Sequence, residues 1–187
     1  MLGTPALIRT LLVTLLLAAG TAVSAQRFQV KLGGKVTEYF SGDAMKGALV
    51  RVLKAGQADQ QATTKGDGRY AFILERGWRY EVWFSKKDMI TKHVIIDTRE
   101  VPAYPDVPFY DMDLQMTLFP WIPEMDLSLF EDPLGMAAYK GNVRNMSWET
   151  PLSEQFRPVL AKLMDEYEKN YKGYYKRTGR SQQEIQH

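Results

Sequence analysis

The sequence predicts a mainly β protein, a β-sandwich followed by a C-terminal amphipathic helix. Apolar and polar side chains alternate over several short segments between residues 35 and 97, which is the period of strands buried on one face. Turn residues separate these segments at short intervals, as they do in sandwiches and barrels. Beyond Pro151 the apolar period changes to three and four residues, the period of a helix with one buried face.

The first 25 residues are typical of an export signal. Arg9 supplies a short positive region, residues 11–19 form an apolar run, and a cleavage site of small residues ends at Ala25. A membrane-spanning helix needs ~20 apolar residues, so retention of this segment as an anchor is the weaker interpretation. We therefore predict a signal peptide over 1–25 and an exported protein, periplasmic or extracellular, with no integral membrane span in the mature chain.

Composition excludes several classes of site. The chain has 187 residues, no cysteine, two histidines, and a formal net charge of +2. Without cysteine it has no disulfide framework or thiol nucleophile, and two histidines leave few ways to build a transition-metal site. The small net charge argues against nucleic-acid binding. We predict no metal, no cofactor and no nucleic-acid partner.

Charge is distributed unevenly along the mature chain. Residues 26–98 carry a surplus of basic side chains, whereas residues 99–150 carry a surplus of acidic ones. Opposite charges favour a middle segment that wraps around the first part. A solvated acidic surface explains the same pattern, and both interpretations stay open.

The predicted strands of the first part are separated by glycine-containing turns. Gly66, Asp67 and Gly68 predict a tight hairpin turn before the strand that begins at Tyr70. The strands are expected at residues 35–40, 47–54, 70–74, 78–85 and 91–97. In the last of them Val94 and Ile96 face the core, which places His93 on an exposed face.

Four motifs follow one another in this region. They are Gly34-Lys35-Val36-Thr37, residues 46–52 (Lys-Gly-Ala-Leu-Val-Arg-Val), residues 63–72 (Thr-Thr-Lys-Gly-Asp-Gly-Arg-Tyr-Ala-Phe) and Tyr80-Glu81-Val82-Trp83-Phe84. In this order they resemble the carboxypeptidase regulatory-like domain. The resemblance implies a transthyretin-like seven-stranded β-sandwich over residues 26–98. It also implies an accessory role, beside catalytic domains, in outer-membrane receptors, or alone in exported proteins of Bacteroidota-like bacteria.

Candidate catalytic residues do not form a recognisable constellation. A serine triad or a zinc site would have to use His93, because His187 lies at a polar terminus and no His-x-x-Glu pair is present. Asp111 and Asp113 are paired carboxylates, yet their spacing of two is typical of the polar face of an edge strand near 110–118. We predict that the protein is not an enzyme.

Residues 99–150 are rich in proline and aromatic residues. Prolines recur at 102, 105, 108, 120, 123 and 133, which argues against long helices and central strands. We expect an irregular acidic extension that lies either on the sandwich or on a partner. Residues 138–148 are expected to form a last hairpin, with its turn at Gly141-Asn142.

The C-terminal helix is predicted over residues 151–176, followed by a disordered tail over 177–187. Pro158 favours a helix that begins near residue 157 with one helical turn ahead of it. Gly173 weakens the far end, so fraying is expected after Lys172. The apolar stripe is rich in tyrosine and packs either on its own sandwich or on another protein.

These observations lead to a non-enzymatic exported module of the bacterial cell envelope, structural or protein-binding, whose partner is an envelope protein. The candidate partner surface consists of Trp83, Trp121, Tyr167, Tyr171 and Tyr174. The alternative is a carbohydrate-binding accessory sandwich, in which Trp83 forms a stacking platform with Trp121 or Trp148. Trp83 is also suited to covering a neighbouring strand.

Overall fold

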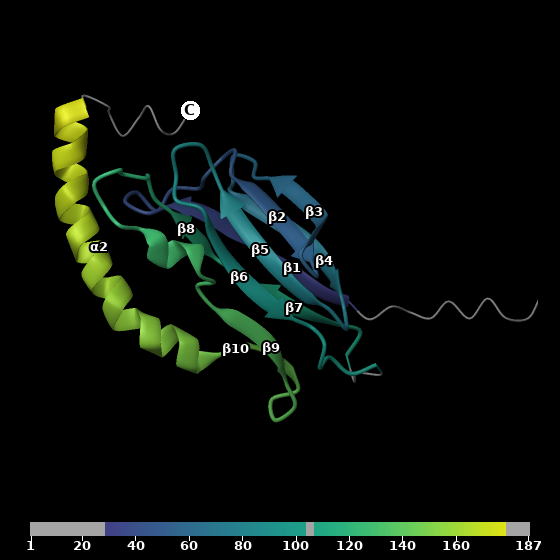
Figure 1. Cartoon of the computed structure of the whole chain (residues 1–187). Coiled ribbons are helices and arrows are strands. Elements are labelled where there is room, and N and C mark those ends of the chain that lie inside the picture. The colour runs from purple at the N-terminus through teal and green to yellow at the C-terminus, as the bar shows by residue number, and fades with distance from the viewer. Residues whose placement is uncertain (1–28, 104–106, 179–187) are drawn as a thin grey trace, which may run out of the picture.

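The protein consists of two β-sheets packed face to face and a long C-terminal helix at one end (Figure 1). The computed structural model describes residues 29–103 and 107–178. The predicted export signal lies outside the described residues, as does all but the start of the predicted tail. No helix within the described ranges is long and apolar enough to cross a membrane.

The smaller sheet is built around β1 (Gln29–Glu38). β4 (Arg69–Glu75) pairs with it antiparallel on one side. On the other side β7 (Phe109–Asp113) and β8 (Met116–Leu118) pair with successive parts of β1 in parallel. Both edges of β1 thus carry strand partners, and its alternate side chains Val30, Leu32 and Val36 are fully buried on the inner face of the sheet.

The larger sheet has six strands in the order β10-β9-β6-β5-β2-β3. All neighbours are antiparallel except β6 and β9, which are parallel. A two-residue turn joins β2 to β3, with positive φ at Ala55 (50°) and Gly56 (80°). The bounds are β2 (Leu49–Lys54), β3 (Gln57–Thr63), β5 (Arg79–Ser85), β6 (Lys92–Asp97), β9 (Met136–Lys140) and β10 (Asn145–Trp148).

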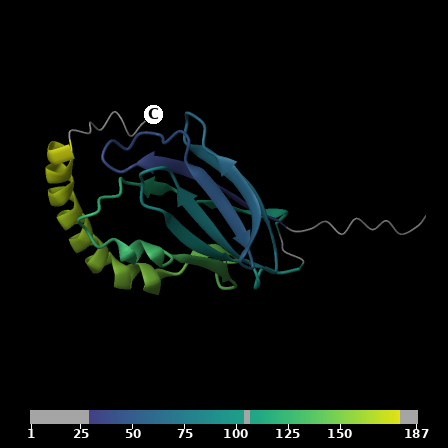
Figure 2. The same cartoon turned by 45° about the horizontal axis from the view of Figure 1, so that its top comes forward.

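A second apolar cluster closes one end of the sandwich under helix α2 (Thr150–Thr178). The helix curves along that end, next to the short 3-10 helix η1 (Ser128–Glu131) (Figures 1 and 2). Tyr167 and Tyr171 of α2 are buried in this cluster, and the hydroxyl of Tyr167 donates to the carbonyl oxygen of Pro120 at 2.7 Å. The helix therefore packs on its own sandwich.

The sandwich and its C-terminal helix confirm the predicted fold class, but the strand count differs. The described residues contain ten strands, because the region from 99 to 150 contributes β7 to β10 instead of an irregular extension. The expected edge strand near 110–118 is present as β7 and β8, and the hairpin over 138–148 is present as β9 and β10. Both sheets thus include strands from both sides of residue 98.

The helix also differs from its prediction. It is continuous from Thr150 through Pro158 and ends at Thr178, so it neither begins near residue 157 nor frays after Lys172. Pro158 has no N–H to donate within the helix. The tyrosine stripe of the helix packs into the second apolar cluster, and tertiary packing of this kind is the main source of helix stability in proteins.

Candidate functional site

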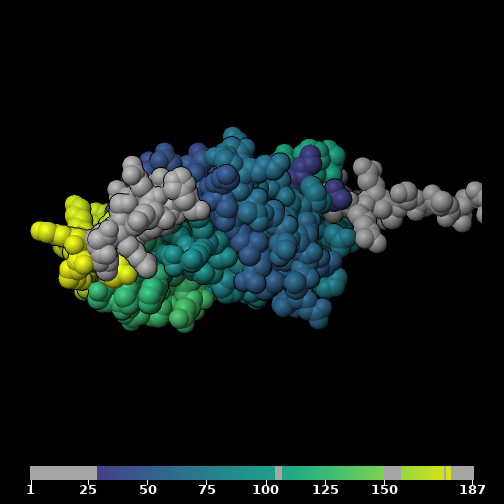
Figure 3. All heavy atoms as spheres, turned by 90° about the horizontal axis from the view of Figure 1, so that it is seen from above, coloured from purple at the N-terminus to yellow at the C-terminus, as the bar shows by residue number. Residues whose placement is uncertain are grey.

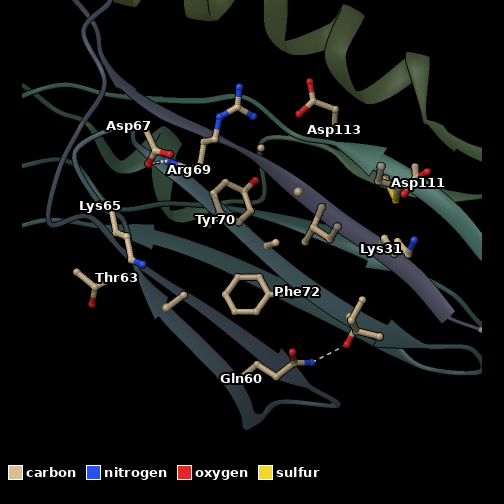
Figure 4. Close-up of a pocket in the computed structure, with 17 residues that line it drawn as sticks. Lys31, Gln60, Thr63, Lys65, Asp67, Arg69, Tyr70, Phe72, Asp111 and Asp113 are labelled. Carbon is tan, nitrogen blue, oxygen red and sulfur yellow. Dashed lines mark hydrogen bonds between the residues drawn. The ribbon is translucent and has the colours of Figure 1, made fainter.

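An open groove of about 920 Å³ lies on the smaller sheet and reaches to β3 of the larger one (Figure 4). Its lining comes from β1, β3, β4 and β7 and from the turn between β3 and β4. β4 and β3 are the outermost strands of their sheets on this side of the described sandwich. The groove therefore follows the open side of the sandwich, where two sheet edges lie near each other.

Small residues make the outer sheet face hollow. Gly33 on β1 lies in register with Ala71 on β4 and with Asp113 on β7. Glycine has no side chain and alanine has only a methyl group, so the sheet surface at these two positions is lower than at the positions that flank them. Tyr70 and Phe72 lie behind it, almost fully buried, and Figure 4 shows both rings within the lining.

Charged side chains of both signs surround the groove. The basic ones are Lys31, Lys65 and Arg69, and the acidic ones are Asp67, Asp111 and Asp113. Lys31 Nζ lies 3.1 Å from the centre of the Phe109 ring, and Asp113 accepts a hydrogen bond from Gln115 Nε2 at 3.0 Å. The rim suits a ligand with both positive and negative groups better than a strongly charged one.

Tyr70 has a structural role in the groove. Its hydroxyl donates to the carbonyl oxygen of Leu114 at 2.6 Å, and the bare Gly34 makes room for that contact. Burial, and secondarily the charge of Asp113, raises the pKa of Tyr70 well above its ordinary value of 10.0. The phenol therefore stays protonated at neutral pH and anchors the crossing between β7 and β8.

Asp111 and Asp113 occupy the positions expected for an edge strand. β7 is the outermost strand of the smaller sheet, and both carboxylates are exposed on the groove side. His93 lies on β6 of the larger sheet, so the structure does not bring it together with the aspartate pair. Among the described residues no cluster of three histidine, aspartate or glutamate side chains is placed to hold a metal ion.

The prediction of an exposed His93 is wrong. The residue is 6% exposed, and its ring stacks on Trp83, with ring centres 3.9 Å apart. All six residues of β6 are buried, because the strand is central in its sheet and the chain near Leu134 hydrogen-bonds to the His93 carbonyl. Burial lowers the pKa of His93, while Glu81 and Asp132 oppose that shift.

The candidate tryptophans do not form a platform. Trp83 is half-buried, covers the neighbouring strand through His93, and donates from Nε1 to Glu81 at 3.0 Å. Trp121 is 54% exposed and Trp148 is 38% exposed. No two tryptophan rings are in contact within the described ranges.

Two of the candidate tyrosines are unavailable to a partner. Tyr167 and Tyr171 are buried in the second cluster beneath α2, so assigning them to a partner surface is wrong for the docked helix. Tyr174 is half-buried at the edge of the same cluster. The apolar residues of α2 from Leu160 to Tyr174 pack into this cluster on the chain's own sandwich, whereas Val159, which the predicted stripe included, is 55% exposed.

Sequence reasoning missed the small residues that shape the groove and one buried lysine of the larger sheet. Gly33 and Ala71 come from strands far apart in the chain, and only the register brings them together. Lys92 is buried at the inner face of β6. Its spacing of two from Val94 was the available signal, because that spacing places both side chains on one face.

No protein-family model and no curated protein sequence matches the chain. Solved structures with a similar arrangement include a 3-chlorocatechol 1,2-dioxygenase from Rhodococcus opacus 1CP, 11% identical, which matches 50% of this chain and 60% of its own at a TM-score of 0.37. A 5-hydroxyisourate hydrolase from Klebsiella pneumoniae, of the transthyretin-like fold, is 10% identical and matches 49% of this chain and 99% of its own at a TM-score of 0.35. The match spans less than two thirds of the dioxygenase.

Proposed function

We propose that this protein is an exported, non-enzymatic binding module of the bacterial cell envelope that holds an extended protein segment in the groove on its smaller sheet. The observation that carries the proposal is the groove that runs from the hollow outer face around Gly33 and Ala71, past the edge strand β4, to β3, bordered by charges of both signs. The assignment to the carboxypeptidase regulatory-like family is part of the proposal and is supported by the four motifs quoted above.

A protein segment suits this groove better than a glycan. Glycan-binding sites commonly present an exposed aromatic face, whereas Tyr70 and Phe72 of this groove are each only 6% exposed. The outer edge of β3 has no strand partner in the described structure. An extended peptide gains affinity from such an edge through main-chain hydrogen bonds and gains specificity from alternating side chains.

Site-specific photocrosslinking tests the proposal. A photoreactive residue is placed at Thr63, which is exposed and lines the groove, or at Gln61, which is exposed on the same strand but does not line it. The full chain is then irradiated with envelope extract from the source cells. A defined adduct from position 63 and none from position 61 is the expected result.

A matched pair of substitutions checks that the groove itself is occupied. Ala62→Lys adds a long charged side chain inside the groove and should remove the adduct, whereas Ala58→Lys makes the same change at an exposed position of β3 outside it. Equal adducts from both labelled positions, or an adduct that survives Ala62→Lys, would refute the groove as the site. Retention of polysaccharide without any protein adduct would favour the carbohydrate-binding alternative.

A further inference from the structure

A second hollow, separate from the groove, lies between the end of the sandwich and α2. Its volume is about 350 Å³, at the lower end of the ~300–1,000 Å³ typical of small-molecule sites. The walls are largely apolar and include Phe119, Phe130, Leu134 and two α2 residues, Leu160 and Met164. Figure 3 shows α2 over this end of the molecule, in yellow.

Lys92 lies at the inner wall of this cavity. The residue is 8% exposed, and its Nζ lies 4.4 Å from the centre of the Phe119 ring and 5.0 Å from that of Phe130. Two aromatic faces thus flank one ammonium group, an arrangement that favours its charged form. Burial has the opposite effect and lowers the pKa of Lys92 to about 7.

The ammonium group has unused hydrogen-bonding capacity. An ammonium carries three N–H donors, and the one acceptor within reach in the described part of the chain is the carbonyl oxygen of Thr117, at 2.7 Å. No carboxylate lies within ion-pair distance of Lys92 among the described residues. A buried cation of this kind is costly unless an anion pairs with it.

The acidic groups near the cavity have partners of their own. Glu38 lines the cavity, and its Oε2 accepts a hydrogen bond from the backbone N–H of Ser41 at 2.7 Å. Glu168 of α2 accepts one from the hydroxyl of Tyr39 at 2.9 Å. These carboxylates make the mouth unfavourable for ligands with several negative charges.

We infer that this cavity binds an apolar monocarboxylate, such as a medium-chain fatty acid, with its carboxylate paired to Lys92 and its chain against the aromatic and α2 side chains. The ligand's carboxylate pairs with the buried ammonium group and uses its free N–H donors, and the apolar walls of the cavity contact the hydrocarbon chain. A single carboxylate satisfies Lys92 while placing no second anion beside Glu38.

The experiment uses the full chain and octanoate labelled with ¹³C at its carboxyl carbon. Binding is followed by isothermal titration and by the carboxyl resonance, with octanol as the uncharged comparison. We expect saturable octanoate binding with Kd below ~1 mM. Affinity should fall as pH rises above 7, because Lys92 loses its proton while the ligand carboxylate stays ionised.

Three variants localise the binding. Lys92→Met removes the charge and should weaken octanoate at least tenfold while leaving octanol unchanged. Leu160→Trp fills the cavity and should weaken both ligands, whereas Val159→Trp, at the neighbouring position that is 55% exposed and outside the lining, should weaken neither.

Contrary results are equally defined. Absence of saturable octanoate binding to the unmodified chain overturns the inference. So does octanoate affinity that is unchanged in Lys92→Met, or equal affinity for octanoate and octanol. Circular dichroism and thermal unfolding of each variant establish that any loss occurs in a folded protein.

Discussion

Replacing Lys92 by methionine should stabilise the protein. The difference between its ordinary pKa of 10.5 and about 7 in the fold, at ~1.4 kcal/mol for each pKa unit, corresponds to a cost of roughly 5 kcal/mol for holding the charge. Methionine fills similar space without charge but loses the hydrogen bond to the Thr117 carbonyl, about 1–2 kcal/mol. We expect a net gain of about 3–4 kcal/mol, within the range of buried charges replaced by apolar residues.

The pH dependence of stability identifies the cause of this gain. The folded pKa of Lys92 lies below the unfolded one, so between pH 7 and 10.5 the unfolded chain binds more protons than the folded chain. Stability of the unmodified protein should therefore rise with pH across this window, and the full cost should be present below pH 7. The methionine variant should lack this contribution.

Urea unfolding at several pH values between 6 and 9.5 measures both effects. Tyr70 and Tyr80, whose pKa values burial raises, remain protonated over this range in both proteins and cancel in the comparison. At neutral pH the gain corresponds to a rise in Tm of roughly 5–10 °C. A variant no more stable than the parent, or one with the same pH slope, would show that Lys92 is solvated and that its burial carries no cost.

Three further changes probe the fold. Gly34→Ala should lower the free energy of unfolding by at least about 3 kcal/mol in urea unfolding, because its new methyl group would overlap the Leu114 carbonyl. The control is Gly33→Ala, whose methyl group meets nothing nearer than 3.7 Å and which should change stability by no more than about 1 kcal/mol. Equal costs for the two variants would contradict the close approach at Gly34. Ala55→Asn should stabilise by about 0.5–1 kcal/mol, since φ of 50° strains alanine more than asparagine, and a lower urea midpoint would contradict this turn. Tyr167→Phe should weaken docking of α2 by about 1–2 kcal/mol, seen as faster amide hydrogen exchange in the helix alone, whereas unchanged exchange would mean that its hydrogen bond contributes little.

Alternating apolar residues were sufficient to predict most strands of the sandwich, because a half-buried strand leaves a direct trace in the sequence. β3 left no such trace: all seven of its residues, from Gln57 on, are polar or small, and the strand lies at a sheet edge. Its available signal was the Ala55-Gly56 pair, since two adjacent residues with positive φ join strands in a hairpin.

The prolines of the middle region were interpreted as arguing against long helices and central strands, but their positions delimit the strands that form there. Pro108 immediately precedes β7, and Pro120 follows β8 after one residue. A strand that ends before a proline loses no ladder hydrogen bond to it. Composition counted over a segment cannot distinguish prolines inside strands from prolines between them, whereas the position of each proline can.

The candidate site was only partly predictable for a related reason. The exposed pair Asp111 and Asp113 follows from alternation within one strand. The hollow between β1 and β4 depends on register between strands separated by a hairpin and a loop, which no local pattern specifies. The sequence also could not show whether the tyrosine stripe binds a partner or packs within the chain, because that depends on which residues cover it. In the structure they are Phe119 and the other residues of the second apolar cluster.

The groove and the cavity share no lining residue, yet β1 contributes to both, through residues 31–34 and residues 37–38. At ~3.3 Å per residue, Gly33 and Glu38 lie roughly 16 Å apart along this strand. Sites at that distance on one packed strand act independently unless the strand has two arrangements. We therefore expect Ala62→Lys to leave octanoate affinity unchanged and Leu160→Trp to leave the photocrosslink from position 63 unchanged. A shift of more than about 0.5 kcal/mol in octanoate binding on filling the groove would instead mean that β1 moves between two positions and that the two sites are coupled.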